Sequence, residues 1–151
     1  MAELIAALGK NIVLMTAVTA WFLAQILKTI TSFWKQREFK AERLVGAGGM
    51  PSSHTSLVVS LAAAVALRDG LESPLFAVAT VLAGIVMYDA AGVRRAAGKQ
   101  AKVLNKLVRE MRVEHTVKDS RLKELLGHTP LEVLAGALLG VTVAYVFSRF
   151  Y

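Results

Sequence analysis

Long apolar blocks alternate with short polar segments along this chain. The blocks cover about residues 11–30, 51–67, 75–93 and 130–148, and the second is the shortest and the richest in alanine. A helix needs about 20 mostly apolar residues to cross a bilayer, so each block is close to membrane-spanning length. The pattern predicts an all-α, polytopic membrane bundle of about four transmembrane helices within a single domain, residues 1–151.

Two polar segments have a helical pattern of their own. Apolar side chains recur with spacings of three and four residues between the third and fourth blocks, at Leu104, Leu107, Val108 and Met111, among several lysines. This spacing predicts a basic amphipathic helix at the membrane surface, although a cap over an active site would show the same pattern. A second short helix is expected over Phe33 to Leu44, ended by the glycines of 46–49.

Composition supports a membrane protein and narrows the chemistry. Hydrophobic residues make up 55% of the chain and the mean hydropathy is +0.51, which is too apolar for a soluble domain of this size. Without cysteine, the chain has no disulfide, thiolate nucleophile or cysteine-bound metal. The net charge of +7 would also suit nucleic acid, but basic residues that flank membrane spans are better explained by anionic lipids.

The basic residues predict an orientation. Ten of the 18 Lys and Arg residues lie between the third and fourth blocks, and four lie between the first and second. The positive-inside rule places both segments in the cytoplasm and both termini outside. We therefore expect an integral protein of a bacterial inner membrane. Four spans form a small bundle, for which a homodimer is one possible assembly.

Two polar segments, 48–55 and 127–132, come directly before apolar blocks. Each combines histidine, proline and hydroxyl side chains: Pro51, Ser52, Ser53 and His54 in the first, and His128, Thr129 and Pro130 in the second. Both blocks begin on the same membrane face in the predicted topology, where the exits of the other two blocks carry Lys28, Lys35, Asp89, Arg94 and Arg95. A nucleophile, an acid and several cations are the groups that phosphoryl transfer requires.

These segments also resemble a known superfamily. Pro51-Ser52-Ser53-His54 resembles the Pro-Ser-Gly-His motif of the type 2 phosphatidic acid phosphatase and vanadium haloperoxidase superfamily. His128, followed four residues later by Glu132 and then by Val133 and Gly136, resembles its last motif. Together with segments 89–95 and 98–101, they are similar to the divergent membrane branch of that superfamily, from Trp21 to the last block.

The resemblance implies phosphomonoester hydrolysis through a phosphohistidine, without a metal or cofactor. It implies that His128 is the nucleophile, that Glu132 orients its ring, and that His54 protonates the leaving group. Ser52, Ser53 and nearby backbone N–H groups would bind phosphate oxygens.

Two departures from the superfamily pattern affect the cationic residues. The first motif is absent, because Lys35 is followed by Arg43 and Leu44 at the wrong spacing, and Arg121 stands one residue too far from His128. Arg94 and Arg95 therefore compete with Arg121 as the phosphate clamp. Asp89 is expected to pair with one of them on the next helical turn.

Several of these residues also have purely structural explanations. Thr129-Pro130-Leu131-Glu132 is a capping box, and Ser52 and Ser53 suit the start of a helix. Gly136 and Gly140 form a GxxxG pattern that favours helix packing. The histidines are harder to explain in this way, because ionisable residues at a span are costly and usually functional.

The predicted function is that of a lipid phosphate phosphatase. A site on the cytoplasmic face favours phosphatidylglycerophosphate or phosphatidate as the substrate. The alternatives are a polyprenyl diphosphate phosphatase, a non-catalytic protein that binds or transports lipid headgroups, and a structural membrane protein. Partners would be the lipid phosphate and anionic membrane lipids, and not nucleic acid.

Overall fold

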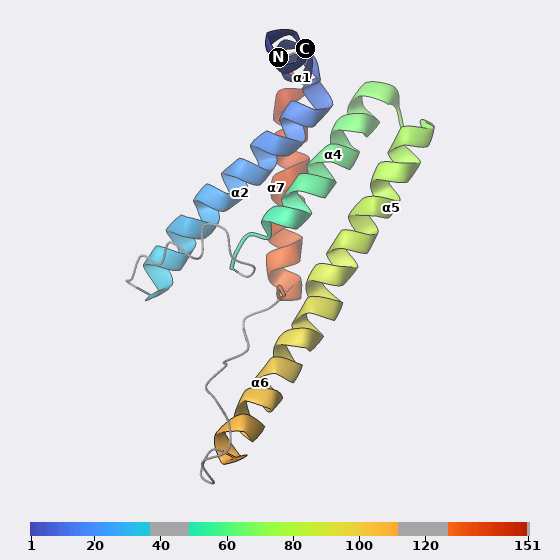
Figure 1. The fold of residues 1–151 in the computed structure, drawn as a ribbon. Coiled ribbons are helices and arrows are strands. Elements are labelled where there is room, and N and C mark those ends of the chain that lie inside the picture. Colours follow the sequence, from blue (N-terminus) through green and yellow to red (C-terminus); the bar gives the residue numbers. More distant parts are fainter. Residues whose placement is uncertain (37–48, 112–126, 151) are drawn as a thin grey trace.

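A computed structural model describes residues 1–36, 49–111 and 127–150 (Figure 1). Within these ranges the chain is helical and contains no strand, which confirms the all-α prediction. The elements are α1 (Ala2–Lys10), α2 (Ile12–Gln36), α4 (Ser53–Asp69), α5 (Pro74–Tyr88), the π-helical turn η1 (Asp89–Val93), α6 (Arg94–Met111) and α7 (Pro130–Phe147).

The long helices form one bundle around α4, which packs against α2, α5 and α7. They run alternately up and down, so that both termini lie at one end (Figure 1). Gly136 and Gly140 of α7 face α4, where an added Cβ would lie 2.5 Å from the Ser52 carbonyl oxygen and 2.8 Å from that of Ser56. The GxxxG pattern therefore serves close helix packing, as predicted.

The outer surface of the bundle is apolar. Val78, Val81 and Ile85 of α5 are each more than 60% exposed, a surface that suits lipid and not water. Three helical segments are long and apolar enough to cross a membrane: Ile12–Trp34, Pro74–Arg109 and Pro130–Phe147. These features establish a helical membrane bundle.

The second predicted span, α4, is not among these three segments. It has 17 residues and buries small polar side chains, among them Ser56 and Ser60. Ser56 donates a hydrogen bond to the Ala20 carbonyl of α2 at 3.2 Å. Small hydroxyl residues let helices approach closely and can bond the backbone within the bundle. Because its neighbours shield α4 from lipid, this helix does not need an apolar surface.

The predicted amphipathic helix is present as α6, but it is not a separate element. It continues α5 through η1, so that Pro74–Arg109 forms one helical segment of 36 residues (Figure 1). At 1.5 Å per residue this segment is about 54 Å long, well beyond the thickness of a bilayer core. The other predicted surface helix differs as well: α2 continues to Gln36, and the remainder of that prediction, 37–44, lies outside the described residues.

Candidate functional site

The two predicted histidines meet at the end of the bundle away from the termini. His54 lies in the first turn of α4, and His128 lies two residues before α7. Their ring centres are 6.5 Å apart, with the ring planes inclined at 59°. His128 is only 3% exposed, whereas His54 is exposed. The antiparallel order of the helices thus unites two residues that are far apart in the sequence.

His128 is held from three sides. Its backbone N–H donates to the Ala90 carbonyl of η1 at 2.8 Å, and its ring Nδ1 lies 3.2 Å from Glu132 Oε2. Gly127 has a φ of +88°, and a Cβ at this position would lie 2.4 Å from the Arg95 backbone nitrogen. A neutral imidazole that donates from Nδ1 to a carboxylate leaves the lone pair of Nε2 free.

The electrostatic environment keeps His128 neutral. Burial lowers the pKa of His128 below its ordinary value, the hydrogen bond and negative charge of Glu132 act in the opposite direction, and the positive charges of Lys28 and Arg94 lower it further. An imidazole with a lowered pKa is unprotonated near neutral pH, which is the form that a nucleophile requires.

Glu132 caps α7 and also contacts the His128 ring. Its Oε2 accepts from the Thr129 N–H at 3.0 Å, and its own N–H donates to Thr129 Oγ1 at 3.3 Å. These two bonds complete the capping box of α7. The same carboxylate oxygen contacts the His128 ring, so capping and orientation are not exclusive alternatives.

The π-helical turn η1 organises the opposite wall of the site. A π turn bonds residues five apart, here the Arg94 N–H to the Asp89 carbonyl. The same turn brings Arg94 Nε within 2.5 Å of Asp89 Oδ2, so the expected ion pair is present. It also presents the Ala90 carbonyl to His128. The spacing of five between Asp89 and Arg94 was the available signal for this turn, which the sequence interpretation missed.

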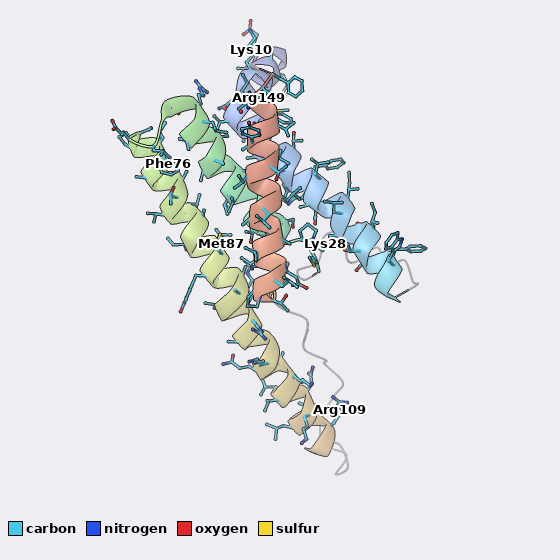
Figure 2. All side chains as sticks on the ribbon, turned by 180° about the vertical axis from the view of Figure 1, so that it is seen from behind. Lys10, Lys28, Phe76, Met87, Arg109 and Arg149 are labelled. Atoms are coloured by element: carbon cyan, nitrogen blue, oxygen red, sulfur yellow. The ribbon has the colours of Figure 1, made fainter. Side chains whose placement is uncertain are left out.

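Lys28 and Arg94 supply positive charge at the histidine pair. Both act electrostatically on His54 as well as on His128. Lys28 is 3% exposed, and its Nζ lies 3.4 Å from Gln25 Oε1. Its aliphatic part packs against Gly49, where a Cβ would come within 3.1 Å of Lys28 Cγ. Figure 2 shows Lys28 between α2 and the lower part of α7.

Other predicted phosphate ligands have different surroundings. The Ser52 hydroxyl is fully buried and caps α4, because it accepts from the Thr55 N–H at 3.4 Å and from the Thr55 hydroxyl at 3.0 Å. Ser53 is also buried, and Arg95 is exposed on α6. The Lys35 side chain and Arg121 lie outside the described residues.

A cavity of about 280 Å³ opens at the other end of the bundle, between α2, α4 and α7. It is lined by Ile12, Val13, Ala64, Leu67, Arg68, Ala144 and Ser148. This cavity is separate from the histidine pair. In the part of the chain that the structure describes, no group of three or more His, Asp or Glu side chains is arranged to hold a metal ion.

Comparisons with known proteins agree with this architecture. A family model described as "Divergent PAP2 family" matches residues 9–143. The chain is 40% identical over 152 residues to the uncharacterized membrane protein YuiD of Bacillus subtilis, a match that covers 93% of this chain and 96% of that protein. No solved structure matches. The chain is an integral membrane protein and belongs to the divergent PAP2 family.

Proposed function

We propose that this protein is a membrane phosphatase that hydrolyses a lipid phosphomonoester through a phosphohistidine at His128. The observation that carries the proposal is the meeting of a buried, carboxylate-bound His128 with His54, beside Lys28 and Arg94. Membership of the divergent PAP2 family supports phosphatase chemistry.

The reaction would proceed in two steps. Nε2 of His128 attacks phosphorus and forms an N–P bond, the P–O ester bond breaks, and His54 gives a proton to the leaving oxygen. The negative charge of the bound phosphate would favour the protonated form of His54 against the positive charges of Lys28 and Arg94. Water then attacks phosphorus while His54 takes a proton from it. The N–P bond breaks and releases inorganic phosphate, so both histidines return to their starting states.

The cations would bind the phosphoryl oxygens. Arg94 presents a guanidinium fork that Asp89 holds at one nitrogen, which leaves other N–H groups for phosphate. Lys28 adds a second positive charge from α2. The two negative charges of a phosphate dianion would offset the positive charges of Lys28 and Arg94 beside the histidine pair. The same two residues would stabilise the negative charge that develops on the phosphoryl oxygens during transfer.

A lipid phosphate of the inner leaflet is the proposed substrate, with phosphatidylglycerophosphate and phosphatidate as the candidates. The site lies at the end of the bundle from which the basic helix α6 departs, and the positive-inside rule would orient that end toward the cytoplasm of a bacterium. Lipid phosphates become accessible there as they are synthesised.

The test is phosphate release by the purified protein in detergent. His128→Ala should abolish release from every substrate. His54→Ala should slow release from phosphatidate by about 100-fold or more, because the alkoxide leaves poorly without an acid, but should slow release from an aryl phosphate far less. Lys10→Ala, at the opposite end of the molecule (Figure 2), is the matched control and should behave as the parent. Full activity of His128→Ala would overturn the mechanism.

A non-catalytic headgroup-binding protein is the second candidate function. It is favoured by the burial of the Ser52 hydroxyl, which accepts two hydrogen bonds as the cap of α4, so that one residue expected to bind a phosphate oxygen is inaccessible to it. Saturable binding of a lipid phosphate without release of inorganic phosphate would establish this alternative. Release only from a polyprenyl diphosphate would instead change the substrate class and keep the mechanism.

A further inference from the structure

Helix α6 carries a straight basic stripe that the candidate site does not use. Its five members, separated by four, three, four and three residues, are all exposed: Arg95, Lys99, Lys102, Lys106 and Arg109. This alternation keeps side chains on one face of an α-helix. The stripe spans the 15 residues from Arg95 to Arg109, or about 21 Å, and Arg109 lies at the far end of the long helical segment (Figure 2).

An apolar strip lies beside the basic stripe. Val103 is 59% exposed, and Leu104 and Leu107 are each 48% exposed. Ala101 and Asn105, on the third side of α6, are buried. A helix with exposed apolar side chains next to lysines and arginines has the composition of an interfacial membrane helix.

The start of the stripe coincides with the expected membrane boundary. Arg95 is 21 residues beyond Pro74, the first residue of the spanning segment, which corresponds to about 31 Å along the helix. The hydrocarbon core of a bilayer is about 30 Å thick. When Pro74 lies at one boundary, Arg95 therefore lies at the other, level with the lipid headgroups.

We propose that α6 binds the anionic leaflet, with its basic stripe on the lipid phosphates and with Val103, Leu104 and Leu107 inserted among the headgroups. In Figure 1 α6 continues the course of α5, which along the membrane normal would carry Arg109 about 21 Å into the water. Contact along the whole stripe therefore requires the segment to bend at η1, so that α6 inclines toward the leaflet. A nucleic acid would match the charge but would leave the apolar strip uncovered. The binding does not depend on phosphatase activity, because Arg94 and the histidines take no part in it.

The absence of cysteine makes a single spin label at Leu107→Cys a clean probe. The labelled full-length protein is reconstituted in nanodiscs of phosphatidylcholine, with or without half phosphatidylglycerol, and collisions with oxygen and with a water-soluble nickel chelate are compared. The expected result is an oxygen-to-nickel accessibility ratio about tenfold higher with the anionic lipid, reversed by high salt. Lys102→Glu with Lys106→Glu should abolish this rise, whereas the matched pair Lys10→Glu with Arg149→Glu at the other end should preserve it.

Three results would overturn the proposal. In the first, the label stays accessible to the nickel chelate in both lipids. In the second, the label is shielded from both reagents, because α6 packs as a cap on the protein. In the third, the accessibility ratio rises with anionic lipid even in the variant with Lys102→Glu and Lys106→Glu. An added DNA duplex provides the remaining comparison. If the duplex immobilised the label in phosphatidylcholine discs at lower concentration than anionic lipid does, the stripe would be assigned to nucleic acid.

Discussion

Residues that are adjacent in the sequence make different contacts in the candidate site, and we therefore propose different roles for them. Arg94 and Arg95 are adjacent in the sequence, yet Arg94 pairs with Asp89 beside the histidines, whereas Arg95 begins the exposed stripe of α6. Glu132 shows the converse, because one carboxylate caps α7 and also contacts His128. At the scale of single residues, then, the role depends on the atoms within reach and not on residue type.

Replacement of Glu132 by glutamine should change the pH dependence of phosphate release. Glu132 raises the pKa of His128 against the effect of burial, so its loss lowers that pKa further. The acid limb of the kcat/KM profile, where His128 becomes protonated, should therefore move to lower pH. The maximal rate should fall by about 100-fold or more, because the tautomer is no longer held. Glutamine also completes a capping box, so an unchanged melting temperature is the control; an acid limb that moved to higher pH would contradict the assignment.

Replacement of Arg94 should weaken the binding of lipid phosphate more than replacement of Arg95. Arg94→Ala removes charge-assisted hydrogen bonds worth about 1.5–3 kcal/mol, and should raise the concentration of lipid phosphate needed for half-saturation by about 10- to 100-fold. Arg95→Ala should change it by less than about threefold, because Arg94 is the arginine that acts on both histidines. The comparison is titration of each purified variant with phosphatidate. An equal loss of affinity for phosphatidate in both variants would show that Arg95 also binds the phosphate.

At the scale of elements, η1 and the turn before α7 form one unit. The π turn presents the Ala90 carbonyl to the His128 N–H, and Gly127 brings the incoming chain against the backbone at Arg94 and Arg95. Only glycine suits this position, since both its positive φ and its close backbone approach exclude a Cβ. The position of the proposed nucleophile therefore depends on the contact between these two elements.

Two glycines with similar positive φ values allow this contact to be tested. Gly127 and Gly70 have φ values of +88° and +85°, but an added Cβ at Gly70 meets nothing within 4 Å. Both alanine variants should lose stability from backbone strain, by about 1–3 kcal/mol. Only Gly127→Ala should also displace His128 and lose most of its phosphate release. Melting temperatures and release rates measured on both variants separate the two effects, and equal activity would show that the contact is dispensable.

At the scale of the whole molecule, the bundle has two chemically distinct ends. Both termini lie at one end (Figure 1), where Lys10 and Arg149 also lie (Figure 2). The histidines and the long basic helix lie toward the other end. A bundle with this separation presents its candidate site to one side of the membrane only. The side chosen decides which pool of lipid phosphates the protein meets.

Labelling of single cysteines should reveal that side. Leu71 lies in the turn between α4 and α5 and is 71% exposed, whereas Lys102 is exposed on α6. In intact cells, an impermeant maleimide should label Leu71→Cys at once and Lys102→Cys only after permeabilisation, because the basic segment stays in the cytoplasm. The opposite pattern would place the histidines outside and would remove the argument for newly synthesised substrates.

Local sequence was sufficient to predict the helical class and the membrane setting, and it singled out the residues of the candidate site. Apolar block length, the capping residues before α7 and the amphipathic spacing of α6 all depend on interactions within a few residues along the chain, so a short window of sequence contains the whole signal. The match of Pro51-Ser52-Ser53-His54 to a superfamily motif likewise singled out His54 from four consecutive residues.

Other features depended on packing between distant segments. The contact of His54 with His128, the choice of Arg94 over Arg95 at that contact, and the burial of Ser52 beneath α7 all arise from tertiary packing. The π turn that continues α5 into α6 also has a tertiary component, because it offers its Ala90 carbonyl to His128. One additional residue in a turn rotates every following side chain around the helix axis, so the face that each arginine presents is set by long-range contacts and not by the local pattern.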